Sequence, residues 1–248
     1  MSEKTSKSAN CKCHPWNRHS PPNLRCDKTQ KMSDKSDDKN LELVVGSCIE
    51  LLESQIGDLH YPNEEATHLC DIAREVGETL IEEGCDSKPA IVAAVLGDLP
   101  YNQDNWKAKV DSMYGKKAGS TWHELAKARI HGHKNDCEKD CDCDSSDSCD
   151  HAHIEGCSED VCVMKRLKEK APTMSGSARA ALMAWFHVMT SRIAGEHPPK
   201  DWTREQKAEY LSKIEVVAQA ILEKGKKSDM DDVIEKLGKK IADTVKEF

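Results

Sequence analysis

Apolar residues recur at helical spacing through most of the chain. The first such face consists of Leu41, Val44, Val45, Cys48 and Leu52. The last consists of Val233, Leu237, Ile241 and Val245, within a helix predicted over residues 230–245. Steps of three and four residues place these side chains on one side of an α-helix, so both segments are predicted to be amphipathic helices that cover a core.

A shorter segment, Ala90–Leu99, is apolar on almost every side. Ser87 is placed to cap its first turn and Pro89 lies within that turn, as is common at the start of a helix. Because a helix without a polar face must be surrounded by other elements, we expect this one in the centre of a bundle. Pro100 breaks the pattern and ends the segment.

Further helices are predicted over residues 65–82, 104–114, 122–130 and 177–193. Another begins at Thr203, which forms a capping-box pattern with Gln206. No segment shows the alternation typical of a strand, so the predicted fold class is all-α. Residues 1–40 lack apolar periodicity and are expected to be a flexible polar tail. Residues 41–248 are expected to form one helical domain, interrupted by an insertion at 131–162.

The charge and composition of the chain exclude several classes of function. The chain has 248 residues and a net charge of −8, which argues against nucleic-acid binding because that requires a basic surface. No apolar run approaches the ~20 residues of a membrane span, and the N-terminal residues lack the apolar core of a secretory signal. We therefore expect an intracellular, cytoplasmic protein without membrane partners, whose 12 cysteines bind metal or remain thiols.

The insertion at 131–162 holds six cysteines, four histidines and ten acidic residues. Its candidate metal ligands are Cys137, Cys141, Cys143, Cys149, His151, His153, Cys157 and Cys162. Thiolates and imidazoles at this density suit Zn²⁺ or Cu(I), and one zinc ion is the expected cofactor. The paired Cys-x₂-Cys spacing of structural zinc sites is absent, so a disordered acidic loop with free thiols stays an alternative. For the Cys11-x-Cys13-His14 cluster in the tail, the alternatives are likewise a bound metal ion and free thiols.

Four segments together resemble one family. They are HLCDIAR at 68–74, IVAAVLGDLPYN at 91–102, KEKAPTMSGSAR at 168–179 and PPKDWTREQKAEYLSKIEVVAQAI at 198–221. In the same order, they resemble motifs of the HD-domain hydrolases of the RelA/SpoT type, especially the small stand-alone metazoan SpoT homologues. The resemblance covers residues 41–130 and 163–248, and it implies an HD-domain helical bundle.

That family hydrolyses the 3′-pyrophosphate of guanosine tetraphosphate with a manganese ion, which lowers the pKa of a bound water. A His, a His-Asp pair and a distant Asp hold the ion. The resemblance places His68 and Asp98 at two of these four positions. Gly97 stands where the second His belongs, and Trp185 stands where the last Asp belongs. Since neither glycine nor tryptophan supplies a ligand, we do not expect Mn²⁺ to bind, and His68 is expected to make an ordinary polar contact.

Two further departures weaken the expected chemistry. Tyr101 and Asn102 stand where the family has a Glu-Asp pair that handles protons. Asn transfers no proton, and a Tyr with an ordinary pKa of ~10 is a poor base near neutral pH. Residues 41–67 contain no Lys or Arg, so they should repel a polyphosphate rather than bind it.

The residues support three hypotheses. The favoured one is a pseudoenzyme, an HD-type scaffold that binds a protein partner or weakly binds a nucleotide and carries a metal-binding insertion. The second is an active metal-dependent nucleotide phosphohydrolase with replacement ligands, for which His60, His123 and His187 are the unplaced candidates. The third is a metal-handling or redox-sensing protein built around residues 131–162.

Overall fold

The computed structural model describes residues 35–56, 68–99, 105–129, 159–195 and 202–248, without the side chains of 35–39 and 159–162. All of these residues lie in one compact unit, Ser33–Phe248. Every regular element within these ranges is a helix, which confirms the all-α prediction. None of the helices so described is long and apolar enough to cross a membrane.

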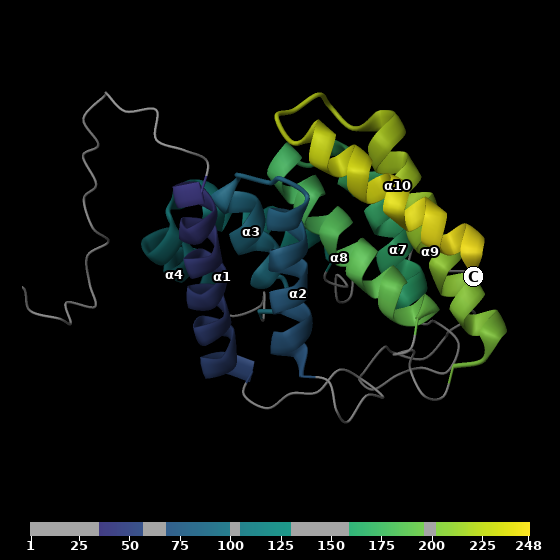
Figure 1. Cartoon of the computed structure of the whole chain (residues 1–248), viewed down its shortest axis with the longest axis horizontal. Helices are drawn as coiled ribbons and strands as arrows, with labels where there is room; N and C mark the ends of the chain where they lie inside the picture. The colour runs from purple at the N-terminus through teal and green to yellow at the C-terminus, as the bar shows by residue number, and fades with distance from the viewer. Residues whose placement is uncertain (1–34, 57–67, 100–104, 130–158, 196–201) are drawn as a thin grey trace, which may run out of the picture. The chain divides into compact units, whose positions relative to one another are not determined.

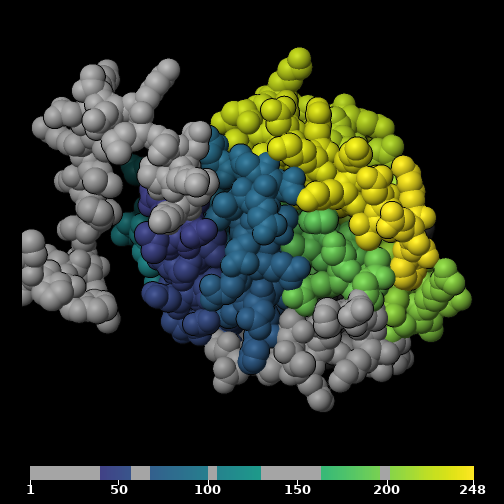
Figure 2. Space-filling view, in the orientation of Figure 1, coloured from purple at the N-terminus to yellow at the C-terminus, as the bar shows by residue number. Residues whose placement is uncertain are grey.

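The helices fall into two groups along the chain. The first contains α1 (Lys35–Ile56), α2 (Leu69–Glu82), α3 (Lys88–Val95), α4 (Trp106–Tyr114) and α5 (Lys116–Arg129). The second contains α7 (Glu159–Lys170), the 3₁₀ helix η1 (Ala171–Thr173), α8 (Gly176–Ala194), α9 (Arg204–Lys224) and α10 (Asp231–Glu247). In Figure 1, α1 and α2 lie side by side, and α10 packs on α8 and α9. Figure 2 shows one face of the unit, formed in turn by α1, α2, α8 and α10.

Helix α3 is central, as predicted. Its residues Ala90–Val95 are all buried, and it contacts α1, α2, α5 and α8. The Ser87 hydroxyl accepts a hydrogen bond from the Ala90 N–H, so the predicted N-cap is present. The helix ends at Val95 rather than Leu99, and residues 96–99 form a turn. This turn carries Gly97 and Asp98.

Helix α8 is the second central element. Most of its side chains between Ser177 and Ile193 are buried, and it contacts α2, α3, α5, α9 and α10. Arg179 is 3% exposed, and its guanidinium donates to the Lys226 carbonyl and, at 3.3 Å, to the Ser228 hydroxyl. This buried arginine therefore ties α8 to the connection between α9 and α10.

Local signals in the sequence located most helix ends. The capping box at Thr203 and Gln206 is present, with both reciprocal hydrogen bonds. Both predicted apolar stripes face the core. The structure adds α7, which the apolar pattern did not predict, and it starts α1 at Lys35 rather than Leu41 and α5 at Lys116 rather than Trp122.

The turn after α3 is held from α5. The buried Trp122 indole donates a hydrogen bond to the Leu96 carbonyl at 2.7 Å. That carbonyl lies at the end of the helix, where it also accepts from the Leu99 N–H at 3.1 Å. The indole therefore supplies a second donor to this carbonyl and fixes the start of the Gly97-Asp98 turn.

We expect Trp122→Phe to lower the free energy of unfolding by about 1–3 kcal/mol, because it removes part of a fully buried side chain together with its hydrogen bond to the Leu96 carbonyl. Urea denaturation followed by far-UV circular dichroism measures this loss. Trp202→Phe is the matched control, because it keeps a ring against Tyr210 at a half-buried position, and we expect it to cost less than about 1 kcal/mol. Equal losses in the two variants would contradict a special role for the Trp122 N–H.

Candidate functional site

A single guanidinium lies at the turn that carries Gly97 and Asp98. It belongs to Arg129, the last residue of α5. Its Nη2 donates to Asp98 Oδ1 at 2.8 Å, forming an ion pair between segments far apart in the chain. The Asp98 side chain is 25% exposed and that of Arg129 is 15% exposed, so the pair is largely withdrawn from water.

The same guanidinium stacks on a residue of α8. Arg129 Cζ lies 4.5 Å from the centroid of the Trp185 ring, within the range of a cation–π contact. Trp185 in turn packs against Phe186, with ring centroids 5.7 Å apart. The Arg129 cation is therefore fixed by a carboxylate from the α3 turn and by an aromatic face from α8.

Gly97 leaves the space that Arg129 fills. A Cβ atom built on Gly97 would overlap the Arg129 Nη1 and would also lie 3.3 Å from the Ala94 carbonyl oxygen. Any side chain at this position therefore competes with the guanidinium for the same volume. Arg129 Nη1 is itself buried and has no hydrogen-bond partner among the described residues.

The structure thus brings together three of the positions singled out in the sequence, Gly97, Asp98 and Trp185, around a residue that sequence reasoning missed. Arg129 stands at the C-terminus of a helix, where basic residues are common for reasons of helix polarity. The sequence around Arg129 therefore did not indicate that this residue belongs to a site. Only the fold places it between α3 and α8.

His68, the remaining predicted HD position, directly precedes α2. Its backbone carbonyl accepts from the Asp71 and Ile72 N–H groups at 3.0 and 3.4 Å, and its side chain does not cap the helix. Tyr101 and Asn102 lie outside the described residues. Among the residues the structure does describe, no three His, Cys, Asp or Glu side chains are grouped so as to hold a metal ion.

The candidate ligands of the insertion stand apart from this description. Cys162 lies within α7, but its side chain is not described. The rest fall outside the described residues, namely Cys137, Cys141, Cys143, Cys149, His151, His153 and Cys157. The tail cluster of Cys11, Cys13 and His14, and His60, lie outside as well. The zinc site therefore stays a prediction.

His187 faces away from Arg129. The charged groups that act on its ring are Lys240 on α10, Glu75 on α2 and Glu83 directly after α2. Burial, aided by Lys240, lowers the pKa of His187 below its usual 6.5, against the opposing effect of the two carboxylates. Its Nδ1 is buried without a hydrogen-bond partner among the described residues. His187 is therefore a half-buried histidine in the surroundings of α2 and α10 rather than a ligand beside Asp98.

Three cysteines inside the bundle are small buried residues with free thiols: Cys48, Cys70 and Cys85. Burial raises the pKa of the Cys48 thiol to about 12 and that of Cys85 to about 11. Thiols with such values are almost entirely protonated near neutral pH, and a protonated thiol is neither a good nucleophile nor a metal ligand. The helical bundle therefore uses these cysteines for packing.

An HD-domain-like helical fold and a closed cation–carboxylate–indole cluster characterise this chain. No family model matches the sequence, and no curated protein matches it. Among solved structures, it is similar to a metazoan orthologue of SpoT that hydrolyses ppGpp and plays a role in starvation responses, with a TM-score of 0.54 at 13% identity. The similarity covers 85% of this chain and 97% of that one, and it concerns the fold.

Gly97→Ala tests whether Arg129 needs the glycine. We expect it to lower the free energy of unfolding by about 1–3 kcal/mol, because the added methyl group overpacks a filled space. In an Arg129→Ala background the same substitution should cost less than about 1 kcal/mol, so that a double-mutant cycle shows coupling. Gly46→Ala is the control, because nothing lies within 4 Å of a Cβ built there. Additive losses would contradict the shared volume.

His187 makes a pH-dependent contribution to stability. Its pKa in the folded chain lies below the 6.5 of an unperturbed histidine, so the unfolded chain binds more protons between the two values. We therefore expect stability to decline as pH falls below about 6.5, and the decline to be shallower in His187→Gln. Urea denaturation at a series of pH values measures both slopes. Identical slopes would show that this imidazole is not held uncharged.

Proposed function

We propose that this chain is a non-hydrolytic member of the HD-type fold, acting as a binding or regulatory scaffold, in which Arg129 replaces the metal ion as the counter-charge of Asp98. One observation carries the proposal: the guanidinium lies against Gly97, pairs with Asp98 at 2.8 Å and stacks on Trp185. These are the residues that the sequence resemblance places at metal-ligand positions. The cluster does not fit a metal ion, because a cation and an indole already fill the space beside the carboxylate.

An arginine reproduces only part of what a divalent ion does. It neutralises the carboxylate permanently, because a guanidinium does not lose its proton in proteins. It has no vacant coordination position, so it neither binds a water molecule as a Lewis acid nor lowers that water's pKa. The exchange therefore keeps the fold's charge balance and removes the means of generating a hydroxide nucleophile.

The surroundings also favour a scaffold over a polyphosphate hydrolase. Arg192, a basic residue in the last turn of α8, is paired with Glu75 by two hydrogen bonds of 3.0 and 2.6 Å. On α1, Glu42, Glu50 and Glu53 are exposed and unaccompanied by any Lys or Arg after Lys39. A protein partner, or a nucleotide bound weakly, fits these features better than a tightly held polyphosphate. The cysteine-rich segment supplies zinc binding in this proposal, on sequence grounds alone.

The test compares two variants that differ only at Arg129. Gly97→His with Trp185→Asp supplies the two missing ligands but keeps the guanidinium, whereas adding Arg129→Ala to these substitutions clears the space. We expect Mn²⁺ affinity at this site to appear only in the triple variant, with Kd at least about tenfold lower than in the double variant. Calorimetric titration of Mn²⁺ measures it, with circular dichroism to verify that each variant folds and Arg129→Ala alone as a control.

The unmodified chain provides the complementary measurement. With Mn²⁺ and guanosine tetraphosphate, we expect no release of pyrophosphate. Turnover that disappears in His68→Ala would overturn the proposal and establish the active phosphohydrolase alternative instead. Equal Mn²⁺ affinity in the double and triple variants would show that Arg129 does not occupy the metal position.

A further inference from the structure

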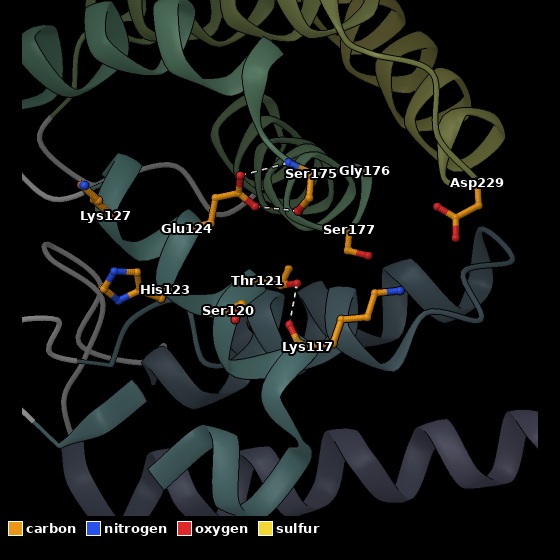
Figure 3. A pocket seen from close by; sticks show the side chains of 10 residues that line it. All are labelled: Lys117, Ser120, Thr121, His123, Glu124, Lys127, Ser175, Gly176, Ser177 and Asp229. Atoms are coloured by element: carbon orange, nitrogen blue, oxygen red, sulfur yellow. Dashed lines mark hydrogen bonds between the residues drawn. The ribbon is translucent and has the colours of Figure 1, made fainter. Parts of the chain in front are cut away.

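A second region of the bundle is an open depression whose lining includes no residue of the Arg129 cluster. It is a cavity of about 610 Å³ between α5, the start of α8 and the connection between α9 and α10. Figure 3 shows the side chains that line it. The volume falls within the range of ~300–1,000 Å³ typical of small-molecule sites.

One polar stripe of α5 forms a wall of this pocket. It consists of Lys117, Ser120, Thr121, Glu124 and Lys127. Steps of three and four residues place them on one side of the helix, over about 15 Å of its axis at 1.5 Å per residue. Only Thr121 among them is buried, and its hydroxyl donates to the Lys117 carbonyl at 2.9 Å. The stripe therefore presents polar groups along the whole length of the pocket.

The single carboxylate of this stripe is already engaged. Glu124 accepts hydrogen bonds from both the N–H and the hydroxyl of Ser175, at 3.1 and 2.6 Å. These bonds fasten α5 to the N-cap residue of α8, where the helix dipole favours a negative charge. The middle of the pocket is thus partly neutralised and rigid.

The two ends differ in charge. Figure 3 shows Lys127 and His123 at one end and Lys117 with Asp229 at the other. Within the described part of the chain, Lys127 forms no ion pair, and the carboxylates that line the pocket are those of Glu124, which is bonded to Ser175, and of Asp229 at the other end. Lys117 faces Asp229, so that end is balanced. An anion is therefore favoured beside Lys127, while hydroxyl groups suit the other end.

We propose that this pocket binds a small phosphorylated polyhydroxy compound, with its phosphate beside Lys127 and His123 and its hydroxyl groups toward Ser120, Lys117 and Asp229. The Lys127 ammonium supplies a charge-assisted hydrogen bond to the phosphate. The Asp229 carboxylate accepts hydrogen bonds from the ligand's hydroxyl groups, whereas the Ser120 hydroxyl both donates to them and accepts from them. The proposal stands independently of the role given to Arg129.

The features of the chain favour a small molecule over a charged polymer. A nucleic acid contacts many phosphates and requires a broad basic face, whereas the chain carries a net charge of −8. Only one end of this pocket has an excess of positive charge. That matches one phosphate on a compact ligand.

The probe is ribose 5-phosphate, and its binding to the full chain is measured by calorimetric titration. Ribose, which lacks the phosphate, and sulfate, which lacks the sugar, are the comparison compounds. We expect saturable binding of ribose 5-phosphate that is tighter than that of either comparison compound. Lys127→Gln should weaken it at least about tenfold, because it removes the charge that pairs with the phosphate. Lys116→Gln is the matched control, since Lys116 is an exposed lysine of α5 outside the pocket, and it should change Kd less than about twofold.

Several outcomes would overturn this assignment. They are the absence of saturable binding, equal weakening by Lys116→Gln, and ribose binding as tightly as its phosphate. A phosphoserine peptide that binds tighter than ribose 5-phosphate would assign the pocket to a protein partner instead. If Lys127→Gln lowers the melting temperature, a chemical-shift map of the unaltered protein decides, with shifts expected at Ser120, His123 and Asp229.

Discussion

The structure depends on how α5 holds the turn that ends α3. Residues Ala90–Val95 of α3 are all buried, so the polar backbone groups of this helix must find partners inside the protein. Trp122 donates a hydrogen bond to the Leu96 carbonyl, and Arg129 provides the counter-charge for Asp98 two residues further along the turn. Both come from the same helix, seven residues apart, so they lie on the same face of α5. The position of this one helix therefore holds the turn that carries Gly97 and Asp98.

The sequence predicted the helices that have strong local signals. Ser87 at the start of α3 and the Thr203–Gln206 capping box mark helix ends through hydrogen bonds within a few residues, which a linear pattern can reveal. Helix α7 lacks such a signal. Between residues 163 and 170 it buries only Met164 and Leu167, and the remaining pattern is dominated by charge. Its stability comes from contacts with α5, α9 and η1, which no local pattern reports.

The candidate site was predictable only as a set of missing groups. Gly97 and Trp185 stood out because glycine and tryptophan cannot bind a metal ion, and Asp98 because it could. What fills the space was not visible, since Arg129 is separated from Asp98 by an intervening helix and looks like an ordinary basic residue at a helix end. A pairing between distant segments is a property of the fold, and a buried carboxylate indicates only that some counter-charge must exist.

The interlock of glycine, arginine and tryptophan also limits the directions in which such a sequence can evolve. A histidine at position 97 meets the guanidinium, an aspartate at 185 removes the ring on which the guanidinium rests, and loss of Arg129 leaves Asp98 without its counter-charge. Each single change toward a metal centre therefore passes through a less stable protein, although the three changes together need not. Strong epistasis of this kind acts as a ratchet: selection for stability alone disfavours the stepwise replacement of the cluster, one substitution at a time.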